Sequence, residues 1–199
     1  MRRELTTSLL AVVIFTVLLG VAYPFGIWAI GQVAFPGKAD GSLVQMDGKL
    51  VGSSLIGQDF SHGPRAAAYF QSRPSQTSYN PAGTFFSNRG PNQASAVAFY
   101  KEGLAGYLAR ERRYDPGLTA AHVPVDAVTT SASGVDPDIS QANARIQAHR
   151  IAAVRHLSLA RADQLIARHT DGRFAGFLGE PGVNVLGLNL ALDKEAPVT

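Results

Sequence analysis

Asp136 and Asp138, which flank Pro137, are carboxylates whose spacing suits chemistry. Two neighbouring carboxyl groups can hold a cation or divide the acid and base steps of a hydrolysis between them. An Asp-Pro-Asp run before an expected helix is more often turn and cap chemistry, and we favour that interpretation. The alternative is that these residues or Asp126 act on a ligand. The protein would then be a membrane-anchored periplasmic binding module or hydrolase.

A second candidate is the hydroxyl-rich run that contains Ser131, Ser133 and Gly134. Its hydroxyls and backbone amides are of the kind that can cradle a phosphate, although a polar loop is the default interpretation. The arginines at 110, 112 and 113 could bind an anion, but cations at the end of an expected helix are explained more simply by the helix dipole.

Other signatures of catalysis are missing from the sequence. It contains no GxxxxGK[ST] loop, no GxGxxG, no GxSxG and no HExxH. The five histidines lack tight ligand spacing and there is no cysteine, so we expect neither a metal site nor a disulfide. Residues alone therefore predict no active site.

The element that most constrains the protein is its N-terminus. Residues 5–37 contain no Asp, Glu, Lys or Arg, and residues 9–30 are rich in Leu, Val, Ile and Phe. About 20 helical residues cross a bilayer core of about 30 Å, so we expect one transmembrane helix rather than a cleaved signal peptide, whose apolar region is shorter. The span includes Leu9, Phe15, Leu19, Pro24 and Trp28. Pro24 removes one helical hydrogen bond and is expected to bend the helix or to be accommodated by a partner helix.

Charge predicts the orientation of this anchor. Arg2 and Arg3 precede the span, whereas the first charges after it are Lys38 and Asp40, so the positive-inside rule keeps the N-terminus in the cytoplasm. We therefore divide the chain into an anchor, residues 1–37, and one extracytoplasmic domain, residues 38–199. Removing Arg2, Arg3 and Glu4 from the chain's 18 basic and 15 acidic residues leaves 16 and 14, a balance that argues against a nucleic-acid partner.

The outer domain is expected to be a mixed α/β domain of the α+β class. Asp47-Gly48 predicts a tight hairpin between residues 43–46 and 49–51. Apolar spacing predicts one helix through Val97 and Leu108, and Ser140 and Ser158 are expected to cap two more. Leucines that alternate with other residues over 186–192 predict a half-buried strand.

Residues 57–92 show no convincing periodicity. Aromatic side chains recur there, which favours an ordered contact surface over disorder. They are Phe60, Tyr69, Phe70, Tyr79, Phe85 and Phe86. We expect part of this segment to dock onto a partner protein, with the open alternative that its aromatics are simply core. The expected docking residues are Tyr69, Phe70, Arg73, Pro74, Ser75, Tyr79 and Asn80.

Ordered sequence blocks along nearly the whole chain resemble a known family. They include GSLV at 41–44, GSSLIGQDF at 52–60, YFQSRPS at 69–75, YNP at 79–81, VPVD at 123–126, SASGVDP at 131–137, LGEP at 178–181 and LNLALD at 188–193. The sequence is similar to the C subunit of the Kdp-type potassium-transporting P-type ATPase of bacteria.

This resemblance implies an accessory subunit, KdpC-like, of a four-part potassium pump in the bacterial cytoplasmic membrane. Its partners would be a channel-like A subunit, an ATP-hydrolysing B subunit and a small F subunit. The sequence has neither the DKTGT phosphorylation motif nor a TVGYG-like filter, so we expect no catalysis by this chain alone.

The family's C subunit is described as a catalytic chaperone that raises the ATP affinity of the B subunit. The resemblance puts the proposed nucleotide contact at Ser131, Ser133 and Gly134. The charge rule places these residues outside the membrane, away from cytoplasmic ATP. We therefore expect no directly bound cofactor and an influence on ATP through the B subunit.

Overall fold

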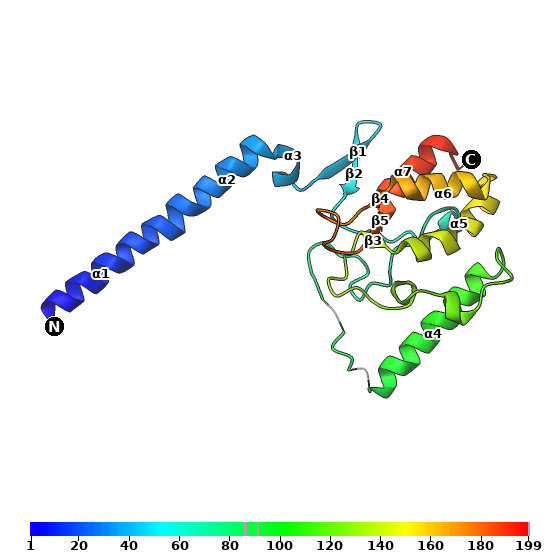
Figure 1. Cartoon of the computed structure of the whole chain (residues 1–199), viewed down its shortest axis with the longest axis horizontal. Coiled ribbons are helices and arrows are strands. Elements are labelled where there is room, and N and C mark those ends of the chain that lie inside the picture. The colour runs from blue at the N-terminus through cyan, green and yellow to red at the C-terminus, as the bar shows by residue number, and fades with distance from the viewer. Residues whose placement is uncertain (86, 91, 199) are drawn as a thin grey trace. The chain divides into compact units, whose positions relative to one another are not determined.

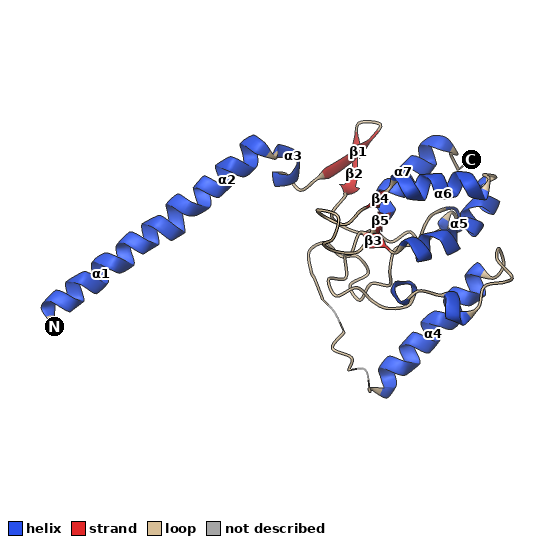
Figure 2. Cartoon of the chain, viewed as in Figure 1, coloured by secondary structure: helices blue, strands red, loops and turns tan. Residues whose placement is uncertain are grey.

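The structure, a computed structural model, is α+β and describes residues 1–85, 87–90 and 92–198 (Figures 1 and 2). It divides into two units, Met1–Leu43 and Val44–Thr199. The α+β class is as expected. The expected domain boundary after residue 37 stays a prediction, and Phe86, one of the aromatics named above, lies outside the described residues.

The first unit is dominated by one long apolar helix. Helix α1 (Arg2–Val17) continues through a π-helical turn (Leu18–Ala22) into α2 (Tyr23–Ala34), and a short helix α3 (Pro36–Ala39) follows. The continuous helix Arg2–Ala34 is long and apolar enough to cross a membrane. The π-helical turn ends at Ala22, two residues before Pro24, and Tyr23 N–H donates to the carbonyl of Leu18, so the helix accommodates the proline without a break.

The expected hairpin is confirmed. Strand β1 (Leu43–Met46) pairs with β2 (Lys49–Ser53), and Asp47 and Gly48 between them have φ angles of 52° and 75°. Positive φ at both turn residues is what a two-residue primed turn requires.

Three helices form the main packing layer of the second unit (Figure 1). Helix α5 (Gln141–Arg155) begins after Ser140 and α6 (Leu159–Arg168) begins after Ser158, and each serine hydroxyl accepts from the third backbone N–H that follows it. Both expected caps are therefore confirmed. Ile151, Leu165 and Ile166 from these helices lie in the buried core, whereas Leu159 is exposed.

The third of these helices corrects the expected strand over residues 186–192. This segment is helix α7 (Val185–Glu195), which begins where the side chain of Asn184 accepts from the N–H of Gly187 at 2.9 Å. Val185, Leu188 and Leu192 recur at helical spacing and are buried, so the leucine alternation coincided with a helical pattern. The cap at Asn184 was the local signal that favoured a helix.

A small antiparallel sheet lies against these helices. Its strand order is β3 (Asp138–Ile139), β5 (Gly182–Asn184) and β4 (Thr170–Asp171). Val183 pairs with both Ile139 and Thr170 and is fully buried. The sheet therefore joins the start of α5, the end of α6 and the start of α7 at one edge of the core.

Helix α4 (Ala94–Glu111) confirms the expected helix but not all of its expected face. Tyr107 is buried, whereas Val97 is 43% exposed. The buried residues Ala96, Tyr107 and Glu111 define the side that faces the rest of the unit. Glu111 forms an ion pair with Arg150 of α5 at 3.2 Å, and both side chains are fully buried.

Candidate functional site

Long-range hydrogen bonds from helix side chains hold the irregular segment around Phe70 in place. Asn189 of α7 accepts from Phe70 N–H at 2.8 Å and donates to the Phe70 carbonyl at 2.9 Å. Gln147 of α5 makes the equivalent pair of bonds with the backbone of Gln71, at 2.7 and 3.1 Å. Arg150 donates to the carbonyls of Ala67 and Tyr69. Helix side chains, rather than a neighbouring strand, therefore supply the hydrogen-bond partners of the backbone N–H and carbonyl groups in this segment.

This arrangement removes Phe70 from the expected docking surface. Its side chain has no exposed area and belongs to the core cluster formed by α5, α6 and α7. The open alternative, that the aromatic is core, is therefore correct for Phe70. Tyr69 is half-buried: its hydroxyl donates to Asp193 at 3.0 Å, and the Arg155 guanidinium lies 4.7 Å from its ring centroid.

The rest of the docking segment packs directly on the serine- and glycine-rich loop. Ser75 Oγ and Thr77 Oγ1 both donate to the Gly134 carbonyl, at 2.5 and 3.1 Å. The N–H of Ser131 donates to the Pro74 carbonyl at 3.2 Å. Two regions that the sequence suggested separately, about 60 residues apart, are one structural unit.

Arg73 and Tyr79 complete this unit. Arg73 Nη1 forms an ion pair with Asp136 at 2.9 Å and Nη2 donates to the Thr130 carbonyl at 3.4 Å. The Tyr79 hydroxyl donates to the Arg73 carbonyl, and burial raises the pKa of Tyr79 above its ordinary value, so it stays a donor. Asn80 is exposed at the end of the segment and accepts from the N–H of Ala82.

Two serine hydroxyls of the serine and glycine loop accept from N–H groups within the loop itself. Ser131 is 3% exposed, and its Oγ accepts from the N–H of Gly134 at 2.8 Å. Ser133 Oγ accepts from the N–H of Val135 at 3.1 Å. Gly134 has a φ of 76°, and a Cβ there would lie 2.6 Å from Thr77 Oγ1. The loop is therefore a tightly packed turn in which the N–H groups of Ser131, Gly134 and Val135 already have acceptors.

The aspartates that suggested acid and base chemistry have structural partners. Asp126 accepts from the N–H and hydroxyl of Ser140 and from Asn143 Nδ2, so it reinforces the start of α5. Asp136 also accepts from the N–H of Asp138 at 3.1 Å, the turn chemistry that we favoured. Burial raises the pKa of Asp138, whose carboxylate accepts from Asn184 Nδ2 at 3.3 Å.

Within residues 1–85, 87–90 and 92–198, no three histidine or acidic side chains come together as metal ligands. Two of the three arginines at the end of α4 are also engaged: Arg110, in the last turn, donates through Nε to Glu111 at 2.7 Å, and Arg112 Nε donates to the Leu118 carbonyl at 2.8 Å.

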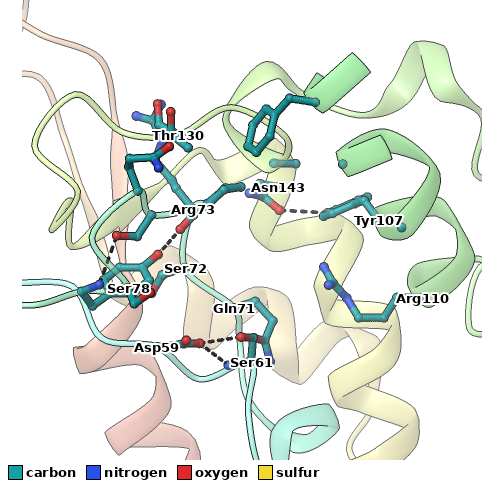
Figure 3. A pocket seen from close by; sticks show the side chains of 18 of the residues that line it. Asp59, Ser61, Gln71, Ser72, Arg73, Ser78, Tyr107, Arg110, Thr130 and Asn143 are labelled. Atoms are coloured by element: carbon teal, nitrogen blue, oxygen red, sulfur yellow. Dashed lines mark hydrogen bonds between the residues drawn. The ribbon is translucent and has the colours of Figure 1, made fainter. Parts of the chain in front are cut away.

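A cavity of about 530 Å³ lies between the irregular segment, α4 and α5 (Figure 3). In Figure 3, Tyr107, Arg110 and Asn143 come from the two helices on one side, and Arg73, Ser72 and Thr130 come from loops on the other. Burial raises the pKa of Tyr107, so its hydroxyl stays protonated and donates to Asn143 Oδ1 at 2.8 Å. The cavity wall is thus built from the segment expected to dock and from elements far along the chain.

Arg89 and Phe99 also line this cavity, and sequence reasoning did not single them out. The Arg89 guanidinium lies 4.4 Å from the Phe99 ring centroid. Arg89 lies outside any helix or strand and Phe99 lies in α4, so no shared periodicity relates them and no local signal marked the pair.

Comparison with known proteins identifies the family of this chain. Residues 5–194 match the family model described as "K+-transporting ATPase, c chain". The chain belongs to the KdpC family. Three relatives, each named as a potassium-transporting ATPase KdpC subunit, support this assignment over almost their full length.

The relative from Mycobacterium tuberculosis (strain ATCC 25618 / H37Rv) is 44% identical over 98% of this chain and 100% of its own length. The relative from Methylococcus capsulatus is 48% identical over 94% and 95% of the two chains. The relative from Herminiimonas arsenicoxydans is 45% identical over 98% and 99%. The KdpC family match includes both the apolar helix and the folded unit, as the sequence blocks predicted.

Proposed function

We propose that this chain is a membrane-anchored accessory subunit of an ATP-driven potassium uptake pump and is not catalytic by itself. The observation that carries the proposal is the family match over residues 5–194, which takes in the apolar helix as well as the second unit. The names of the relatives describe a subunit of a potassium-transporting ATPase. The partners proposed from the resemblance are the A, B and F subunits.

The chain's contribution is assembly or stabilisation of the pump rather than hydrolysis. Asp126 and Asp136, which could have served a hydrolase, bond to Ser140 and Arg73. The exposed docking residue is Asn80, together with Gln76 and Ser78 of the same segment. These side chains lie on a turn that hydrogen bonds hold in place: Ser75 Oγ donates to the Gly134 carbonyl and accepts from Tyr79 N–H. A partner would therefore bind a preorganised surface.

Any effect on the ATP affinity of the B subunit is proposed to be indirect. The Gly134 and Val135 N–H groups of the serine and glycine loop donate to Ser131 and Ser133. A phosphate would have to displace these bonds, one of which is buried. We propose that the loop supports the docking segment and that the B subunit alone holds the nucleotide.

The orientation follows from charge: Arg2 and Arg3 keep the N-terminus in the cytoplasm of a bacterium and the second unit lies outside. A periplasm-dependent reporter fused to the C-terminus is expected to be active. Changing both arginines to glutamate should lower that activity, and changing Lys38 and Lys49 instead serves as the control. Activity of a cytoplasm-only reporter at the same position would overturn the orientation.

Co-purification tests the function. The full chain, tagged at its C-terminus and expressed with genes for the other three subunits, should come out of detergent with a multispanning partner and with potassium-stimulated ATP hydrolysis. The chain expressed alone should hydrolyse no ATP. A matched variant, in which residues 5–34 are replaced by an unrelated apolar helix, separates the contribution of the anchor sequence from simple membrane attachment. Purification of the wild-type chain without partners would contradict the proposal.

A further inference from the structure

The loop of residues 172–181, which joins β4 to β5, exposes three large apolar side chains (Figure 1). Phe174 is 78% exposed, Phe177 is 70% exposed and Leu178 is 51% exposed. Residues 174–179, the tip of the loop, contain no polar or charged side chain. A single exposed apolar residue is ordinary, but a cluster of them marks a surface that binds a partner or a membrane.

The backbone of this tip is hydrogen-bonded within the loop. Phe174 N–H donates to the Leu178 carbonyl at 2.8 Å, and Leu178 N–H donates to the Phe174 carbonyl at 2.9 Å. Gly176 N–H donates to the Arg173 carbonyl at 3.1 Å. Ala175 and Gly176 turn the chain with φ angles of 52° and 83°. Because these N–H groups already have acceptors, the tip can enter a poorly hydrated region without losing hydrogen bonds to water.

The charged side chains of the loop lie at its base and neutralise each other. Arg173 Nη2 donates to the two carboxylate oxygens of Glu180, at 2.9 and 2.8 Å. These two residues are the only charged ones among residues 172–181. An apolar tip above a polar base is the arrangement of a segment that enters the interface of a bilayer.

The base of the loop is fixed beside the segment through which the chain enters the second unit. Asn184 of β5 donates through Nδ2 to the Ser54 carbonyl at 2.9 Å, and Ser54 directly follows the hairpin of β1 and β2. Leu55, the next residue, and Leu50 of β2 are also exposed. Exposed apolar side chains therefore come from two segments that are joined at Asn184.

The anchor indicates what the loop contacts. Residues 35–43 join the apolar helix, which ends at Ala34, to the second unit, which begins at Val44. A link of this length extends at most about 36 Å, so the lipid surface stays within reach at a high effective concentration. Interfaces between proteins have a polar rim, for which the tip offers no side chain, whereas the lipid boundary requires only apolar area.

We propose that residues 172–181 form a membrane-contact loop. Phe174, Phe177 and Leu178 insert at the boundary between the headgroups and the acyl chains of the bilayer that holds the chain's own anchor. The inference rests on the proposed anchor and goes beyond it, because it gives the second unit another attachment to the same membrane. Two attachments restrict the rotation of the second unit over the bilayer.

The first experiment uses the full chain in phosphatidylcholine vesicles with and without brominated acyl chains, which quench tryptophan on contact. Trp28 is the only tryptophan and lies in the apolar helix, so its quenching in the wild-type chain tests the anchor. In a Trp28→Phe background, the tryptophan introduced by Phe177→Trp should be quenched several times more strongly than that introduced by Leu159→Trp. Leu159 is the matched control, because it is an exposed residue at the end of α6 remote from β4.

The second experiment places a charge on the tip. With the tryptophan introduced by Phe174→Trp as reporter, adding Phe177→Asp should remove the quenching, because a charged side chain opposes insertion. Adding Leu159→Asp instead should leave the quenching unchanged. These positions are exposed, so each variant should keep the Tm of its parent within about 2 °C by circular dichroism.

The outcomes separate the loop from the anchor. Quenching of Trp28 without quenching in Phe177→Trp would overturn the loop and leave the anchor intact, as would quenching that persists with Phe177→Asp. An unquenched Trp28 would contradict the proposed anchor and the loop with it. If Phe177→Trp is unquenched and Phe177→Ser lowers recovery of the partner subunits from the co-expressed complex, the loop binds a protein instead.

Discussion

Asn189 of α7 satisfies both backbone polar groups of Phe70, with bonds of 2.8 and 2.9 Å between residues 119 positions apart. The Asn189 side-chain amide offers Phe70 one acceptor and one donor, as the backbone of a neighbouring strand would in a sheet. It allows a segment without periodicity to carry a fully buried aromatic into the core.

Asn189→Ala should therefore be strongly destabilising. It leaves the buried N–H and carbonyl of Phe70 without partners, each at about 1–3 kcal/mol, so we expect a loss of roughly 3 kcal/mol in the free energy of unfolding. Urea unfolding of the full chain in detergent, monitored by far-UV circular dichroism, measures this free energy of unfolding. Asn80→Ala, an exposed asparagine, is the control and should change stability by less than about 0.5 kcal/mol. Equal effects of the two variants would contradict the anchoring of Phe70 by Asn189.

Substitutions at buried Phe70 and exposed Asn80 distinguish the core from the proposed docking surface. Phe70→Ala opens a cavity in the core and should cost about 3–5 kcal/mol, so any weakened assembly follows from lost folding. Asn80→Arg changes an exposed position and should lower recovery of the partner subunits while the Tm stays within about 1 °C of wild type. Normal recovery for Asn80→Arg would remove this segment from the docking surface.

Substitutions in the serine and glycine loop should change the stability of the fold and should have little effect on nucleotide-dependent transport. Gly134→Ala places a Cβ 2.6 Å from Thr77 Oγ1 at a φ of 76°, so it should destabilise the chain by more than about 1 kcal/mol. Ser133→Ala removes one partly exposed hydrogen bond and should leave transport largely intact.

The purified full chain should bind MgATP no better than millimolar, an affinity of about 4 kcal/mol, in equilibrium dialysis. Micromolar binding that Ser133→Ala abolishes would restore a direct nucleotide contact. Ser95→Ala, at an exposed position in α4, is the matched control.

Asp138 gives the stability a predictable dependence on pH. Burial is the main cause that raises its folded pKa, the hydrogen bond from Asn184 lowers it, and the nearby charges of Asp136 and Asp171 raise it further. A group with a raised folded pKa contributes stability below its unfolded pKa, about 3.9, and that contribution is lost as the pH rises through the folded value. Asp138→Asn should therefore raise the Tm at pH 7 and less so at pH 4. A lower Tm at pH 7 would contradict the burial effect.

The sequence alone determined the features that depend on residues close together in the chain. The uncharged run in residues 5–37 predicted the apolar helix, Asp47-Gly48 predicted the hairpin turn, and Ser140 and Ser158 predicted two helix starts. Each of these depends on interactions within a few residues, which is why the pattern of a short window was sufficient.

Tertiary structure decided what short windows do not encode. The leucines near Leu188 fit both a strand period and a helical period, and the core decided between them, because α7 buries Val185, Leu188 and Leu192 in one cluster with α5 and α6. Phe70 entered the core, and Ser75 met Gly134, through side chain to backbone bonds across 59 to 119 residues. Arg73 and Arg89 also line one cavity in the folded chain. Such pairings leave no periodicity in the sequence, so only the folded chain could place them.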